Sequence, residues 1–109
     1  MSYTVRLTTR AAADVRSIFR YIVDRSPQGA ANWNDAYEAA IERLENQPLL
    51  CGLAAENEWF DFEMRQILFK TRSGKPYRAV FCIESHEIIV FRVRGHGQAP
   101  ITPKDLPNG

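Results

Sequence analysis

The chain has 109 residues and a mass of 12.5 kDa, which is enough for one domain and too little for a second independent one. Its composition, 45% hydrophobic and 25% charged, is that of a globular protein rather than a disordered or fibrous one. Fourteen Lys and Arg residues are balanced by 13 Asp and Glu residues. A net charge of +1 therefore does not indicate a nucleic-acid or membrane-surface protein, and any charge-based function must come from a local patch.

The N-terminal sequence lacks the apolar segment of a signal peptide, and no apolar run reaches the roughly 18 residues that a membrane helix requires. The two cysteines, Cys51 and Cys82, are far apart and form no CxxC or Cys/His pair with metal-ligand spacing. We therefore expect two free thiols, a cytoplasmic location, no membrane association, and neither a metal nor an organic cofactor.

The chain begins with a predicted strand and helix. Residues 3–7 alternate apolar and polar side chains, which predicts a short strand, and Thr8-Thr9 follows as a candidate N-cap. Apolar residues then recur at three- and four-residue steps from Ala11 to Val23. This spacing predicts an amphipathic helix of about four turns.

A second helix follows at once. Ser26-Pro27 both ends the first helix and favours the start of another, with Ser26 as N-cap and Pro27 at the first helical position. An apolar stripe from Ala30 to Leu44 continues until Asn46-Gln47-Pro48 ends it. Because the connection is so short, the two helices are expected to form an antiparallel hairpin.

The second half of the chain is predicted to form a three-stranded antiparallel meander. Residues 47–61 have no steady period and indicate a loop. Residues 97–109 are rich in proline and glycine, which favours an extended tail over another packed element. The strands are expected at Phe62–Thr71, Tyr77–Glu84 and Glu87–Arg94, with turns at Ser73-Gly74 and Ser85-His86.

These elements predict an α+β fold of order β-α-α-β-β-β, in which an N-terminal helical hairpin covers one face of a small, largely antiparallel sheet. Residues 1–96 would form the single domain and residues 97–109 the tail. The other face of the sheet would then be open to a partner.

The near-zero net charge conceals a difference between the two halves. Residues 1–61 carry a charge of −3 and residues 62–109 a charge of +4, so the sheet half is the positive one. A two-residue turn at Ser85-His86 fixes the register of the last hairpin. The predicted pairs are Ile83 with Ile88, Phe81 with Val90, Ala79 with Arg92, and Tyr77 with Arg94.

This register predicts which face the helices cover. It places Val80, Cys82, Ile89, Phe91 and Val93 on the covered face, with Arg78 near its edge, unless a bulge shifts the register by one and exchanges the faces.

The other face would carry Tyr77, Arg92, Arg94 and His96. Such a cluster suits phosphate binding, because guanidinium groups pair with oxyanions and aromatic rings stack on bases. The alternative is a solvated strand end with ordinary ion pairs.

Several segments, taken in order, resemble the RelE/ParE toxin superfamily across roughly residues 3–96. They are Arg10–Ile22, Ser26–Trp33 and Ala39–Leu44 in the helices, and Arg65–Phe69, Tyr77–Phe81 and Ile89–Arg94 in the strands. The resemblance implies a small bacterial toxin of a type II toxin–antitoxin, or plasmid stabilisation, system. It also implies a cognate antitoxin that silences the toxin and sets its oligomeric state.

The superfamily has two activities. ParE-like members inhibit DNA gyrase without being enzymes, whereas RelE-like members cleave messenger RNA on the ribosome. The long hairpin with Ser26-Pro27, the low net charge, and Glu63 in the strand where RelE carries paired lysines favour the ParE branch. An inactive relative that acts only as a binding protein is the third alternative.

The resemblance and the charge pattern together give three sets of candidate residues. Trp33 and Tyr37 also fit core packing on the inner stripe of the second helix, and packing is the alternative for Trp59 and Phe60. If the chain is a ribonuclease, the catalytic candidates are Tyr77, Arg78, Arg94 and His96. The target-binding candidates are Arg65, Arg72, Lys75, Arg92 and Arg94, and the antitoxin-binding candidates are Trp33, Tyr37, Trp59 and Phe60.

Overall fold

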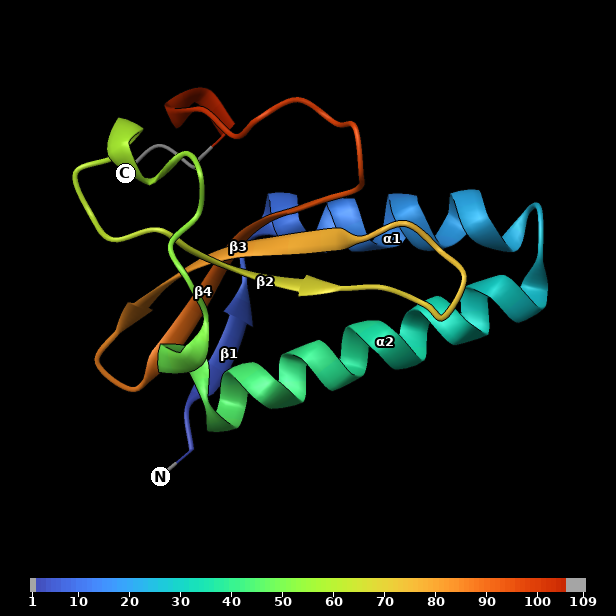
Figure 1. Ribbon diagram of the computed structural model, residues 1–109, viewed down its shortest axis with the longest axis horizontal. Helices are drawn as coiled ribbons and strands as arrows, with labels where there is room; N and C mark the ends of the chain where they lie inside the picture. Colours follow the sequence, from blue (N-terminus) through green and yellow to red (C-terminus); the bar gives the residue numbers. More distant parts are fainter. Residues whose placement is uncertain (1, 106–109) are drawn as a thin grey trace.

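Two helices pack on one face of a four-stranded sheet in the computed structural model, which describes residues 2–105 (Figure 1). The order of elements confirms the predicted β-α-α-β-β-β fold. The elements are β1 (Thr4–Leu7), α1 (Thr9–Val23), α2 (Pro27–Asn46), β2 (Arg65–Phe69), β3 (Tyr77–Glu84) and β4 (Glu87–Arg94). Short 3-10 turns occur at Pro48–Leu50, Asn57–Trp59 and Pro103–Asp105.

Both predicted helix caps are present. The Thr8 hydroxyl accepts a hydrogen bond from the Ala11 amide at 3.1 Å, and the Ser26 hydroxyl accepts one from the Gly29 amide at 2.9 Å. Pro27 occupies the first position of α2, where its missing N–H costs nothing. The short turn between the helices makes them double back as a hairpin (Figure 1).

The strands lie in the order β1-β4-β3-β2. β2, β3 and β4 form the predicted antiparallel meander, and β1 pairs in parallel with the first half of β4. Past Val90, which pairs with Leu7, no strand in the described part of the chain lies beside the outer edge of β4. There Asp14 of α1 accepts a hydrogen bond from the Val93 amide at 2.9 Å, so the helix satisfies part of the free edge.

The register of the β3–β4 hairpin is as predicted only near the turn. Phe81 lies opposite Val90, but an irregularity follows, because Val80 pairs with Arg92 and leaves Phe91 as an extra residue. The predicted pairs of Ala79 with Arg92 and of Tyr77 with Arg94 are therefore wrong. Arg94 instead lies opposite Arg78.

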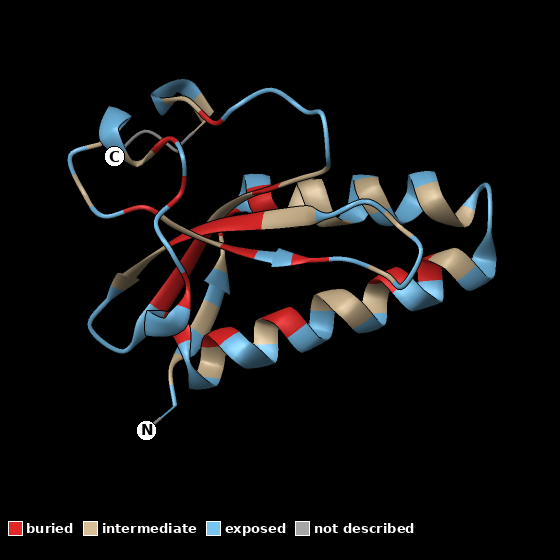
Figure 2. Ribbon diagram, in the orientation of Figure 1, coloured by how far each residue is buried: buried red, intermediate tan, exposed pale blue. Residues whose placement is uncertain are grey.

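The bulge and the packing also correct the predicted faces. The helices cover the face of Phe81, Ile88 and Val90 together with Ala79 and Val93, whereas Val80 and Phe91 lie on the opposite face. Arg78 likewise lies away from the helices. Figure 2 shows the buried positions of both helices turned toward the sheet.

The face opposite the helices is covered, contrary to prediction. A second core gathers there from the segment after α2 and from the residues after β4. These two segments meet at one end of the sheet (Figure 1). Its members are Ala54, Met64, Val80 and Ile101, with Phe60, Phe62 and Phe91 packed against them.

The predicted extended tail is therefore docked on the sheet as far as Asp105, and its last four residues, 106–109, lie outside the described part of the chain. Cys51 and Cys82 are both free thiols, as expected. Between residues 2 and 105, neither helix is long and apolar enough to cross a membrane.

Candidate functional site

Arg78 is held by a buried carboxylate. Its Nη1 donates to Glu56 Oε1 at 2.8 Å, and its Nη2 forms a second bond to the same carboxylate. Glu56 is only 2% exposed and also accepts a bond from the Ile101 amide at 2.9 Å. Hydrogen bonding from Arg78 outweighs burial and lowers the pKa of Glu56 from 4.5 to about 2.

Arg92 and Arg94 share a second carboxylate. Both guanidinium groups donate to Asp105 Oδ1, at 2.8 and 3.0 Å, and Arg92 also donates to both oxygens of Asp14. Burial alone would raise the pKa of Asp105, but the Thr102 amide and the two guanidinium groups lower it. For Arg92 the direction is the opposite, because the hydrogen bond to Asp14 raises the pKa of the guanidinium group.

Arg65 is engaged as well. Its Nη1 donates to the Cys51 carbonyl and its Nη2 to Glu63, each at 2.7 Å. The four arginines of β2, β3 and β4, which we call the sheet arginines (Arg65, Arg78, Arg92 and Arg94), are thus each at most one-fifth exposed and paired internally. The predicted positive face is neutralised by the chain itself.

Tyr77 and His96 lie elsewhere. Tyr77 packs in the helix-side core, and both residues line a cavity of about 720 Å³ between the helical hairpin and the ends of the strands. Successive strand residues point to opposite faces, so Arg78 and its neighbour Arg94 lie across the sheet from Tyr77. The structure does not bring the four nuclease candidates together.

The two remaining candidates for a target-binding surface are free. Arg72 and Lys75 are exposed in the loop between β2 and β3. Within residues 2–105, no ion pair involves either side chain.

The antitoxin candidates divide between core and surface. Trp33 is 1% exposed and stacks on Tyr37 with ring centroids 5.5 Å apart, so it is a core residue. Phe60 packs on Phe62 in the second core. Trp59 is 51% exposed and is the one large indole that a partner could reach directly.

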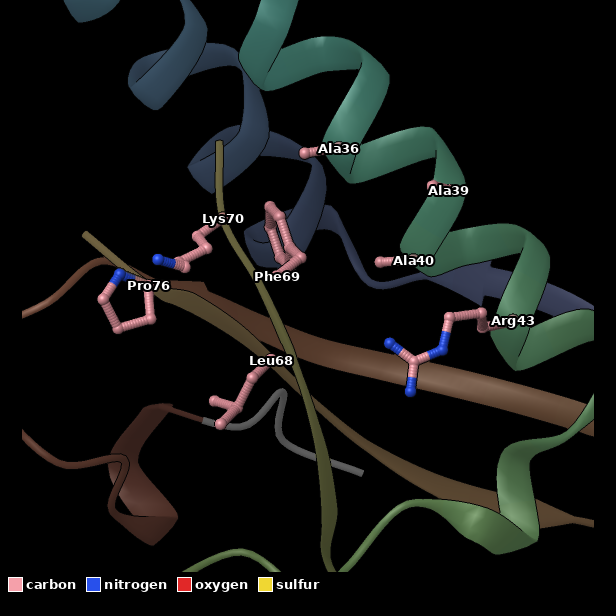
Figure 3. A pocket seen from close by; sticks show the side chains of 8 residues that line it. All are labelled: Ala36, Ala39, Ala40, Arg43, Leu68, Phe69, Lys70 and Pro76. Carbon is pink, nitrogen blue, oxygen red and sulfur yellow. The ribbon is translucent and has the colours of Figure 1, made fainter. Parts of the chain in front are cut away.

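A groove of about 640 Å³ runs between α2 and the edge strand β2 (Figure 3). Its helix wall is formed by small side chains and Arg43, and Phe69 fills the space between β2 and the helix. Leu68 points the other way and is exposed. The lining residues are Ala36, Ala39, Ala40, Arg43, Leu68, Phe69, Lys70 and Pro76.

Half of the β2 edge is already paired. The Gln66 amide donates to the Gly52 carbonyl at 3.0 Å, and the Ala54 amide donates to the Met64 carbonyl at 2.8 Å. Beyond Gln66, no strand within residues 2–105 lies beside this edge. The groove and this free edge together form a surface suited to an extended or helical segment of a partner.

Sequence reasoning missed Glu56 and Asp105, two of the carboxylates that neutralise the sheet arginines. The acidic composition of residues 51–62 was a visible signal for Glu56 alone, and Asp105 had no comparable signal. Across the described residues, no group of three or more His, Cys, Asp and Glu side chains is placed to hold a metal ion.

Comparisons with known proteins agree with the fold. The family described as "ParE toxin of type II toxin-antitoxin system, parDE" matches residues 5–100. Among solved structures, the chromosomal ParDE toxin–antitoxin system of P. aeruginosa matches with a TM-score of 0.65 and 20% identity, over 85% of this chain and 95% of that one.

The RelBE2 toxin–antitoxin complex of Mycobacterium tuberculosis matches with a TM-score of 0.53 and 26% identity, over 88% of this chain and 100% of that one. No curated protein sequence matches this chain.

Proposed function

Since the chain belongs to the ParE toxin family of type II toxin–antitoxin systems, we propose that it inhibits DNA gyrase in the bacterial cytoplasm and that a cognate antitoxin neutralises it. The family match spans nearly all of the described residues. ParE-like inhibition requires a binding surface rather than a catalytic centre.

The arrangement of the nuclease candidates carries the choice between the two activities. Cleavage of RNA by its own 2′-hydroxyl needs a proton acceptor, a proton donor and cations around one phosphate. Arg78 and Arg94 are paired with Glu56 and Asp105 on one face of the sheet, whereas Tyr77 and His96 line a cavity on the other side. This separation favours a ParE-like inhibitor over a RelE-like ribonuclease.

A supercoiling assay with purified gyrase tests the proposal. We expect the protein to inhibit supercoiling and to trap cleaved DNA, and His96→Ala to leave both effects intact because no proton transfer is involved. Messenger RNA in a translating extract should remain whole at the same protein concentration.

Two results would overturn this function. A protein that spares gyrase but truncates messages, with cleavage impaired by Arg78→Ala and His96→Ala, would be a RelE-like nuclease. A protein that does neither, and whose expression without its antitoxin leaves growth unaffected, would be an inactive relative.

The groove between α2 and β2 supports an antitoxin segment that lies across the hairpin and the sheet. Ala39 is exposed on the wall of this groove, so Ala39→Glu should weaken the complex with the product of an adjacent small gene about tenfold or more. Ala31→Glu places the same charge on an exposed part of α2 outside the groove and should leave the affinity unchanged. Equal losses in the two variants, measured by calorimetry, would argue against this surface.

A further inference from the structure

The exposed side of α1 and the turn after it is basic. Arg16, Arg20 and Arg25 are all exposed there, and Asp24 is the one carboxylate beside them in the described part of the chain. Asp14, the one acidic residue within α1, is turned to β4, where it pairs with Arg92. The outward side of α2 is instead acidic and carries Asp35, Glu38 and Glu42.

Unlike the sheet arginines, these guanidinium groups are available. In residues 2–105, Arg16 and Arg20 take part in no ion pair or side-chain hydrogen bond. Arg25 has no carboxylate partner there either; it lies over the ring of Tyr21, 3.6 Å from the centroid, and donates to the Tyr21 carbonyl. The guanidinium groups of Arg16, Arg20 and Arg25 are therefore open to an anion, whereas the sheet arginines are already paired.

Tyr21 joins this helix surface to a cavity. It is 59% exposed and lines two hollows that meet at Ser17 and Tyr21. One hollow is lined by the three arginines, and the other is the cavity of about 720 Å³ that holds Lys75. Among residues 2–105, no acidic side chain lines this larger cavity, whose walls include aromatic and aliphatic side chains.

We propose that this surface binds single-stranded nucleic acid. We call it the α1 arginine face and define it as Arg16, Arg20, Arg25, Tyr21 and Lys75. The guanidinium groups would pair with successive phosphates, since their planar forks match phosphate oxygens. An unpaired base would enter the cavity beside Tyr21, where aromatic rings provide stacking that tolerates any base.

The composition of this face favours a nucleic acid over an acidic protein. Apart from Asp24 and Tyr21, the residues that line this hollow with the arginines are Ala13 and Ser17, which offer little apolar area. A protein interface normally has an apolar core, whereas neutralising a phosphate backbone requires only the cations. This inference goes beyond gyrase inhibition and does not depend on it.

Fluorescence anisotropy with a labelled oligothymidylate tests the proposal without gyrase. We expect binding at low salt that weakens linearly in a plot of log K against log salt. Arg16→Gln/Arg20→Gln should weaken binding about tenfold and make the slope shallower by about 1.4, because each lost contact with single-stranded DNA contributes about 0.7. Tyr21→Ala should weaken binding about fivefold or more, and Tyr21→Phe should retain it because the ring does the stacking.

Arg43→Gln is the matched control. Arg43 is exposed near the C-terminal end of α2 and does not belong to the α1 arginine face. Arg43→Gln therefore changes the net charge alone, and we expect this variant to bind the oligonucleotide as the wild type does. No binding at low salt would overturn the proposal, as would equal weakening per charge removed by Arg43→Gln and by the double variant. Binding of a glutamate-rich peptide in place of the oligonucleotide would also overturn it. Unchanged circular dichroism and thermal midpoints would show that the variants are folded.

Discussion

Glu56 connects three segments that are distant in sequence. Its carboxylate lies in the loop after α2 and binds the guanidinium of Arg78 in β3 and the amide of Ile101 after β4. A buried carboxylate is tolerated only when its charge and lone pairs are satisfied in this way. Removing one partner should therefore lower the free energy of unfolding by more than the intact pair contributes to it, because the other charge stays buried without a counter-charge.

Glu56→Gln keeps the size of the side chain and removes its charge. Because Arg78 would be left largely buried without a counter-charge, we expect the free energy of unfolding at pH 7 to fall by about 3 kcal/mol. Urea denaturation followed by circular dichroism measures this change. Glu58→Gln, an exposed neighbour, should leave stability within about 0.5 kcal/mol of the wild type.

The lowered pKa of Glu56 also predicts a pH dependence. A carboxyl group with a lower pKa in the folded than in the unfolded state stabilises the fold above its unfolded pKa, and this stabilisation is lost as the pH falls through its folded pKa. The free energy of unfolding should therefore decrease between about pH 4.5 and about pH 2. Glu56→Gln should show a shallower decrease over that range, and identical slopes would contradict this assignment.

Local contacts explain which residues the sequence could reveal. Thr8 and Ser26 cap helices through amides three positions ahead, so their roles are visible in short motifs. The pairs of Arg78 with Glu56 and of Arg92 with Asp14 join residues 22 and 78 positions apart. No short motif marks such partners, so the sequence alone places Arg92 on an open face and Arg78 at the edge of the helix-covered one.

At the scale of elements, the segment after β4 differs most from expectation. Its prolines and glycines correctly exclude a long helix or strand, but they do not show whether the segment is free or docked. Ile101 is fully buried in the second core, and Asp105 pairs with Arg92 and Arg94. A single apolar residue in irregular backbone has no periodicity that would reveal its burial.

Truncating Ile101 tests whether this docked segment stabilises the fold. Ile101→Ala should lower the free energy of unfolding by about 3 kcal/mol, because it removes buried methyl groups and leaves a cavity against the sheet. Leu50→Ala truncates a side chain that is 76% exposed and should change stability by about 0.5 kcal/mol or less. Equal effects in urea denaturation would mean that the segment is not docked in solution.

The strands show a similar division. The bounds of β3 and β4 match the prediction because apolar alternation and the Ser85-His86 turn are local signals. The extra residue at Phe91 has no such signal, yet it moves every later side chain of β4 relative to β3. This one residue explains why Arg94 lies opposite Arg78. It does not explain the face of Phe81 and Val90, which precede the shift: both faces of the sheet are buried, so apolar alternation alone could not show which of them the helices cover.

For the whole molecule, one sheet is shared by two cores, and each side contains a tryptophan. Trp33 lies in the helix-side core, and Trp59 lies in the loop that covers the other face. Because both layers pack on the same strands, we expect them to unfold together. The distribution of charge is also a property of the folded molecule. The summed charge of residues 1–61 is negative, but this sum conceals a basic start of the chain, because five arginines and two aspartates fall within residues 1–25.

Single-tryptophan variants test this cooperativity. Trp59→Phe leaves Trp33 as the reporter of the helix side, and Trp33→Phe leaves Trp59 as the reporter of the opposite side. Within each variant, the urea transitions followed by fluorescence and by far-ultraviolet circular dichroism should coincide. An earlier fluorescence transition in Trp33→Phe would show that the covering loop detaches independently of the sheet.

The parallel pairing of β1 with β4 joins residues 4–7 to residues 87–90. Synthesis must therefore be nearly finished before the first strand finds its neighbour. A polypeptide released early by a stalled ribosome would lack that neighbour and could not complete the sheet, so we expect truncated copies to be unfolded and open to proteolysis.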